Sequence, residues 1–104
     1  MLGMSNTGIK GPWALGGERM AELRSRQEIT RKELAEQAGL PDARWVADVE
    51  AGRRAIPSVY FKCLARAFGL SVADFAALCL KYYDANAYSA LFGDSVAQPS
   101  KVAA

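Results

Sequence analysis

Apolar residues recur at helical spacing over residues 17–92, and this periodicity limits the chain to an all-α fold. The clearest stripe has Phe61, Leu64, Ala65 and Phe68 at positions i, i+3, i+4 and i+7. No segment alternates apolar and polar residues with β-branched enrichment, so the sequence predicts no strands. A length of 104 residues suits one compact domain, for which we expect five to six helices.

Capping residues and glycines predict where these helices begin and end. The run T-R-K-E at Thr30–Glu33 is a capping box, in which the Thr30 hydroxyl accepts from the Glu33 amide and the Glu33 side chain reaches back. Gly39, Gly52 and Gly69 suit helix ends. The expected helices span about 17–27, 30–38, 42–51 and 57–69, then a fifth that begins behind Ser71, and a short sixth at 87–92.

The two ends of the chain differ in composition from the middle. Residues 1–16 are rich in Gly with Ser, Asn and Pro and show no period, so we expect a flexible N-terminal arm with Trp13 as its only large apolar anchor. Residues 93–104 are small and polar, and they predict a disordered tail.

The composition argues against catalysis. The chain has no histidine, which removes the commonest general base, the Ser–His and Cys–His pairs and the usual metal ligand. Cys63 and Cys79 fit no zinc spacing, and we expect both to be small core residues. We therefore expect no enzyme, no metal and no cofactor. Without a membrane span or a signal peptide, the expected location is cytoplasmic. A net charge of +2 alone does not indicate a nucleic-acid partner.

Residues 30–52 carry the functional signal. A capped helix, a tight turn at Gly39 and a second helix closed by Glu50-Ala51-Gly52 have the sequence form of a helix-turn-helix. The run GERMAELRSRQEITRKELAEQAGL, followed by V-x-x-V-E-x-G-R-R and by L-A-R-A-F-G-L, resembles the Cro/phage-repressor family, also called the xenobiotic-response-element type. The resemblance covers about residues 17–75. It implies a repressor-like DNA-binding domain at 17–70, with the helix-turn-helix formed by the second and third helices.

The resemblance also implies which residues contact double-stranded DNA. Arg44 has the geometry to bind guanine and Asp48 to accept from cytosine. Trp45 is unlike the small polar residues usual at such positions, so packing is an alternative role for it. The implied base contacts are Ala43, Arg44, Trp45 and Asp48, and the implied backbone contacts are Thr30, Arg31, Lys32, Arg53 and Arg54.

Two further expectations concern the fold and its assembly. Arg24 and Glu50 occupy the positions of the family's interhelical ion pair, which specifies the fold without touching DNA. Residues 71–92 contain more apolar surface than one core can bury, which favours a homodimer; the alternative is that the sixth helix folds back over this surface. The expected seam consists of Leu80, Tyr83, Tyr88, Leu91 and Phe92.

The sequence therefore predicts a DNA-binding transcriptional regulator, a repressor that acts as a homodimer on a palindromic operator. One alternative is an antitoxin or immunity-type partner that also represses its own operon. Another is a helical adaptor that uses the aromatic surface and does not bind DNA.

Overall fold

The computed structural model describes residues 11–93 and confirms the all-α fold, since this part of the chain contains six α-helices, one short 3₁₀-helix and no strand. No helix within it is long and apolar enough to cross a membrane. The elements are α2 (Ala14–Arg26), α3 (Arg31–Ala38), α4 (Ala43–Glu50), η1 (Ser58–Tyr60), α5 (Phe61–Phe68), α6 (Val72–Tyr83) and α7 (Ala85–Phe92).

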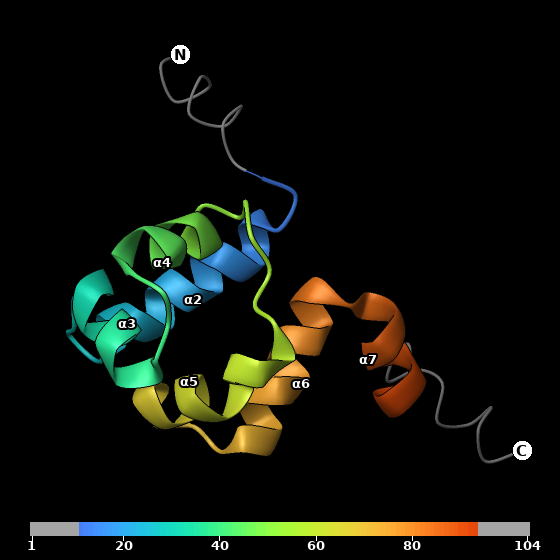
Figure 1. The fold of residues 1–104 in the computed structure, drawn as a ribbon. Helices are drawn as coiled ribbons and strands as arrows, with labels where there is room; N and C mark the ends of the chain where they lie inside the picture. The colour runs from blue at the N-terminus through green and yellow to red at the C-terminus, as the bar shows by residue number, and fades with distance from the viewer. Residues whose placement is uncertain (1–10, 94–104) are drawn as a thin grey trace, which may run out of the picture.

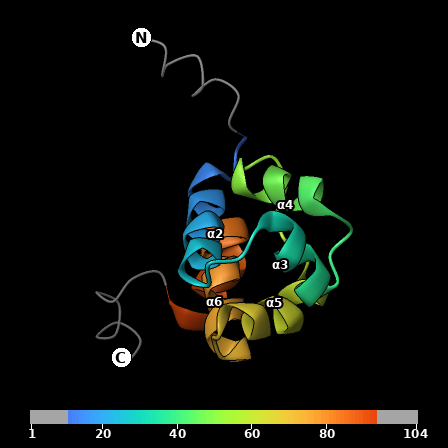
Figure 2. The same cartoon turned by 90° about the vertical axis from the view of Figure 1, so that its left-hand side faces the viewer.

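The helices α2 to α6 form a bundle, and α7 stands to one side of it (Figure 1). α4 packs on α2 and α3 at one end of the bundle, whereas α5 and α6 pack together at the other end (Figure 2). The core between them consists of apolar side chains from α2 to α6. Its buried members are Met20, Leu23, Leu34, Ala35, Ala38, Leu40, Trp45, Val46, Val49, Ile56, Leu64, Ala65, Phe68, Phe75 and Cys79.

The predicted caps are present. The Thr30 hydroxyl accepts from the Glu33 amide at 3.0 Å, and the Thr30 amide donates to the Glu33 carboxylate at 2.8 Å, so both halves of the capping box form. Ser71 caps α6 in the same way, through the amide of Asp74. Gly39 ends α3 with a φ of 70°, a left-handed conformation that glycine adopts without steric cost.

The first helix begins earlier than predicted, at Ala14, so residues 14–16 do not belong to an arm. The segment before it is held by backbone hydrogen bonds, from Gly11 to the Ala51 carbonyl at 3.1 Å and from Trp13 to the Gly52 carbonyl at 3.0 Å. Gly52 has a φ of 80°, and a Cβ there would lie 2.5 Å from the Ala14 nitrogen. These long-range bonds have no local sequence signal. The rest of the predicted arm and nearly all of the predicted tail lie outside the described residues.

Two other expectations are wrong. Cys63 is exposed on α5, and only Cys79 lies in the core. Tyr83 does not lie on an exposed seam: its ring packs against the core and forms an edge contact with Trp13, with 6.5 Å between ring centroids. α6 therefore turns Tyr83 toward α2, because the early start of α2 brings Trp13 and Gly16 to it.

The hydroxyl of Tyr83 is buried without a hydrogen-bond partner in the described part of the chain. An unpaired buried hydroxyl costs about 1–3 kcal/mol of stability. We therefore predict that Tyr83→Phe raises the free energy of unfolding at neutral pH by about 1 kcal/mol or more, measured by chemical denaturation. Tyr82→Phe, at the half-buried neighbouring position, is the control and should change it by less than about 0.5 kcal/mol. A loss of stability in Tyr83→Phe would contradict this account.

The same variant has a pH-dependent consequence. Burial raises the pKa of Tyr83 above its ordinary value of 10.0, so the stability present below pH 10 is lost as the pH rises further. Burial likewise raises the pKa of Cys79 to about 12. Tyr83→Phe should thus lose less stability than the unmodified chain between neutral and alkaline pH.

Candidate functional site

The helices α3 and α4 pack directly against each other and are joined by the turn at Gly39. The Asp42 side chain begins α4 by accepting from the Trp45 amide at 2.8 Å. The buried stripe of α4 consists of Trp45, Val46 and Val49, and this stripe faces α2 and α3. The opposite side of α4 is consequently turned outward.

Arg44 is the most prominent side chain on that outward side. It is exposed and makes no hydrogen bond or ion pair within residues 11–93. Three of its neighbours on the same side are small, since Ala43, Ala47 and Ala51 are alanines that are each partly exposed. A long cation beside several alanines gives a surface that another molecule can approach closely.

The carboxylate of Glu50, at the end of α4, joins three helices. It accepts from Arg24 Nε at 2.6 Å and from Arg24 Nη2 at 3.2 Å, and it accepts from Arg31 Nε at 2.8 Å. The side chain of Glu50 is only 5% exposed. Arg24 also donates to the Ile29 carbonyl at 2.8 Å, and its hydrogen bond to Glu50 raises the pKa of its guanidinium. The structure thus brings Arg24 and Glu50 together, and it adds Arg31 to the pair.

Asp48 lies on the outward side of α4, where it is paired. Its Oδ1 accepts from Arg53 Nη2 at 2.9 Å. Arg53 belongs to the loop that follows α4, and its side chain is 49% exposed. The structure therefore places Asp48 against a cation of its own chain.

Trp45 does not face outward, which contradicts the prediction that it contacts a base. It is 9% exposed and packs in the core, with an edge contact to Tyr60 at 5.2 Å between ring centroids. The guanidinium of Arg54 lies 5.5 Å from the centre of the Trp45 ring, a cation–π geometry. The packing alternative for Trp45 is the one that the structure shows.

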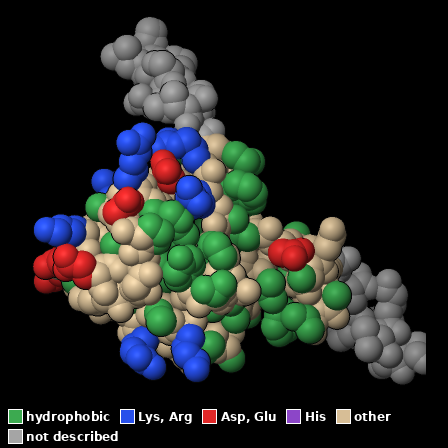
Figure 3. Space-filling view, in the orientation of Figure 1, with side chains coloured by type: hydrophobic (Ala, Val, Ile, Leu, Met, Phe, Trp, Pro, Cys, Tyr) green, Lys and Arg blue, Asp and Glu red, His purple; other side chains and the backbone are tan. Residues whose placement is uncertain are grey.

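The remaining predicted side chains lie around α4. Lys32 is exposed on the first turn of α3, and no hydrogen bond or ion pair holds it among the described residues. Thr30 is engaged in its capping box. Figure 3 shows that Lys and Arg side chains gather at the end of the molecule where α4 lies, with acidic side chains among them. The surface combines Lys32 and Arg44 with the arginines 31, 53 and 54.

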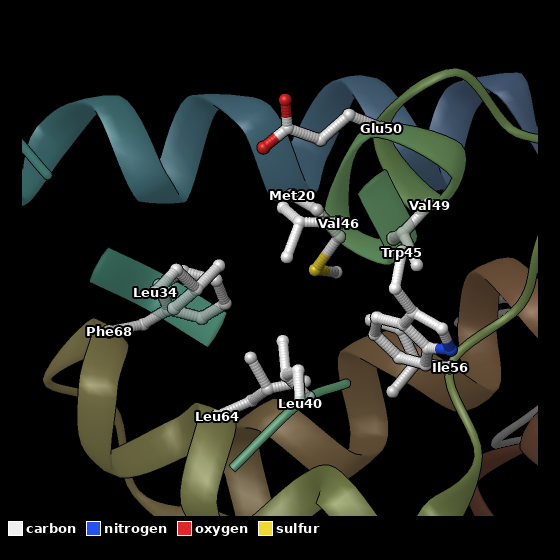
Figure 4. Close-up of a pocket in the computed structure, with 10 residues that line it drawn as sticks. All are labelled: Met20, Leu34, Leu40, Trp45, Val46, Val49, Glu50, Ile56, Leu64 and Phe68. Carbon is white, nitrogen blue, oxygen red and sulfur yellow. The ribbon is translucent and has the colours of Figure 1, made fainter. Parts of the chain in front are cut away.

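The interior beneath α4 leaves no room for a small-molecule ligand. Its cavity measures about 10 Å³, roughly the space for one water molecule (Figure 4). The described residues also contain no group of three side chains that could hold a metal ion. The lining of the cavity consists of Met20, Leu34, Leu40, Trp45, Val46, Val49, Glu50, Ile56, Leu64 and Phe68.

The sequence did not predict one residue of this surface and two contacts near it. Ala47 shares the outward side of α4 with Arg44 and could have been found by counting four positions from Ala43. The Ile29 carbonyl that accepts from Arg24, and the contact of Arg54 with Trp45, have no sequence signal because they depend on the fold.

Residues 17–78 match the family model described as "Helix-turn-helix domain", which covers more than half of the chain. The matched stretch contains α3, α4 and α5 whole and reaches into α2 and α6. This match confirms the resemblance at the level of a helix-turn-helix family of DNA-binding regulators. No curated protein and no solved structure matches the chain.

The Glu50 cluster yields a stability prediction. Glu50→Leu leaves Arg24 without its buried partner and should lower the free energy of unfolding by about 3–5 kcal/mol. Arg24→Met should have a smaller effect, since Arg31 still neutralises Glu50. The double variant should cost less than the sum of the two losses, because each residue acts through the other. Thermal melts of the four proteins measure this, and small, additive losses would contradict it.

Proposed function

We propose that this chain, which belongs to the helix-turn-helix domain family, is a sequence-specific DNA-binding regulator of transcription. The observation that carries the proposal is the outward side of α4, where Arg44 stands beside alanines and makes no ion pair with any described residue. Cations from α3 and from the loop after α4 flank it. In this proposal α4 is the recognition helix and enters the major groove, which is wide enough for one helix.

Two kinds of contact follow from this placement. Arg44 reads base edges, since a guanidinium can donate two hydrogen bonds to guanine. The cations on either side of α4 contact the phosphates of the two strands, which position the protein without reading sequence. Lys32 and Arg31 serve one strand, and Arg53 and Arg54 serve the other. Thr30 begins α3 next to this surface, where the positive end of the helix dipole favours an anion.

We further propose that the protein is a cytoplasmic repressor that acts as a homodimer on a palindromic operator. The support for self-association is α7, which buries none of its residues and carries no charged side chain. Leu91 and Phe92 are 67% and 57% exposed, although Phe92 contacts Tyr88 at 4.9 Å between ring centroids. The proposed seam consists of Leu80, Tyr88, Leu91 and Phe92. A second copy of an uncharged helix is the simplest cover for such a surface.

The first experiment is selection of bound sequences from random duplex DNA. The unmodified protein should enrich a palindromic motif that contains a guanine in each half-site. Arg44→Ala should weaken binding to that motif by about 1–3 kcal/mol and relax one position of it. Lys32→Ala is the matched control, since loss of a phosphate contact weakens all sequences alike and reduces the salt slope by about one. An unchanged motif in Arg44→Ala would contradict the assignment of Arg44 as a base reader.

The second experiment tests the seam. Leu91→Asp with Phe92→Asp should give a folded monomer, because both side chains are exposed and the core remains intact. The monomer should bind the operator far more weakly, since a palindrome needs two recognition helices about 34 Å apart. Leu15→Asp, at another exposed leucine, is the control and should leave the dimer intact. If the unmodified protein sediments as a monomer and still binds the operator with full affinity, the proposed seam is wrong. That result would favour another protein as the partner of α7.

A further inference from the structure

We propose that the polar and aromatic side chains of α4, other than Arg44, position arginines for phosphate contact and do not read bases. The inference rests on the proposed DNA-binding function and goes beyond it, because it gives Asp48, Glu50 and Trp45 a role in affinity. Each of these three side chains holds one arginine from a flanking segment: Asp48 holds Arg53, Glu50 holds Arg31 and Trp45 holds Arg54.

The pair of Asp48 and Arg53 shows the geometry most clearly. Only one of the five N–H groups of the Arg53 guanidinium is used by Asp48, through Nη2 at 2.9 Å. The Arg53 side chain is 49% exposed, whereas that of Asp48 is 26% exposed. The Asp48 side chain is thus more buried than the Arg53 side chain, which covers it. The Asp48 carboxylate holds the Arg53 cation at the surface. The same contact occupies the carboxylate, so it is not available to a cytosine base.

The other two contacts have the same form. Glu50 holds Arg31 by Nε, and neither Nη group of Arg31 makes a hydrogen bond within residues 11–93, so both can face an anion. The Arg31 side chain is 49% exposed beside a 5% exposed carboxylate. Trp45 is buried and supports exposed Arg54 with its ring face. In all three cases the inner side chain belongs to α4 and the outer side chain is an arginine.

The repeated arrangement has a physical advantage. A free arginine loses side-chain entropy when it is fixed on a phosphate, and long side chains of this kind lose the most. An arginine already held in one orientation loses less on binding, so pre-organisation increases affinity. Base reading is then left to Arg44 and to the alanine surface around it, where small side chains permit contact with a thymine methyl group.

The opposing expectation is electrostatic. Asp48 is negative, so if it only repels phosphate, its removal must increase affinity whatever stands at position 53. If it positions Arg53, its removal must decrease affinity, but only while Arg53 is present. The two accounts differ in sign, which makes Asp48→Ala in two backgrounds the decisive measurement.

The experiment uses the full chain and the duplex selected by the unmodified protein, with affinities measured at several salt concentrations. In the unmodified background Asp48→Ala should weaken binding about two- to fivefold, as expected for a partly exposed ion pair. In the Arg53→Ala background it should leave affinity unchanged or raise it slightly. The selected motif should be the same with Asp48→Ala as without it. Glu36→Ala is the matched control, because exposed Glu36 pairs with no arginine in the described part of the chain and its removal should not weaken binding.

Two results would overturn the inference. One is an increase in affinity on Asp48→Ala in both backgrounds, which assigns repulsion alone. The other is relaxation of one motif position by Asp48→Ala, which makes Asp48 a base reader. Both require that the unmodified protein binds DNA. Failure of the unmodified protein to bind any duplex at low salt would instead overturn the proposed function.

Discussion

The carboxylate of Glu50 is the charge on which the arrangement of α2, α3 and α4 depends. Removing a carboxylate from water costs several kcal/mol unless it is paired and hydrogen-bonded. Glu50 meets this requirement through Arg24 of α2 and Arg31 of α3, which both donate to its carboxylate. Apolar packing is not directional, whereas these bonds require one geometry. Because α3 and α4 have eight residues each and are too short to be stable alone, this cluster helps to determine how they cross.

The sequence was sufficient for the helical segments and for the caps Thr30 and Ser71, but it extended the fourth helix over Ser58–Tyr60, which form a 3₁₀-helix. Thr30 and Ser71 act within one turn of the chain, and such local signals survive folding unchanged. The pair of Arg24 and Glu50 was also predictable, but only through the resemblance to a family. The start of α2 was not, because the Gly11 and Trp13 amides bond to the far end of α4, and nothing near them in the sequence indicates that partner.

The site was less predictable than the fold for a related reason. Its residues were placed near α4 by motif spacing, but spacing does not tell which side chains hold one another. Trp45 is the clearest case: its position suggested an outward residue, whereas Tyr60 and the core draw the ring inward and leave Arg54 above it. Tyr83 was misplaced similarly, since Trp13 covers it. Contacts between segments distant in sequence decided the outcome in each case.

The modest net charge of +2 is compatible with DNA binding when the placement of the charges is considered. Long-range attraction depends on net charge and is screened within about 10 Å at ordinary salt. Contact with phosphate depends instead on a few cations in fixed positions. Around α4 the acidic side chains of Asp48 and Glu50 each contact an arginine. Their negative charges therefore orient these cations, although they also reduce the net positive charge of the chain. A protein built this way gains little from electrostatic steering and must obtain its affinity from the geometry of the bound complex.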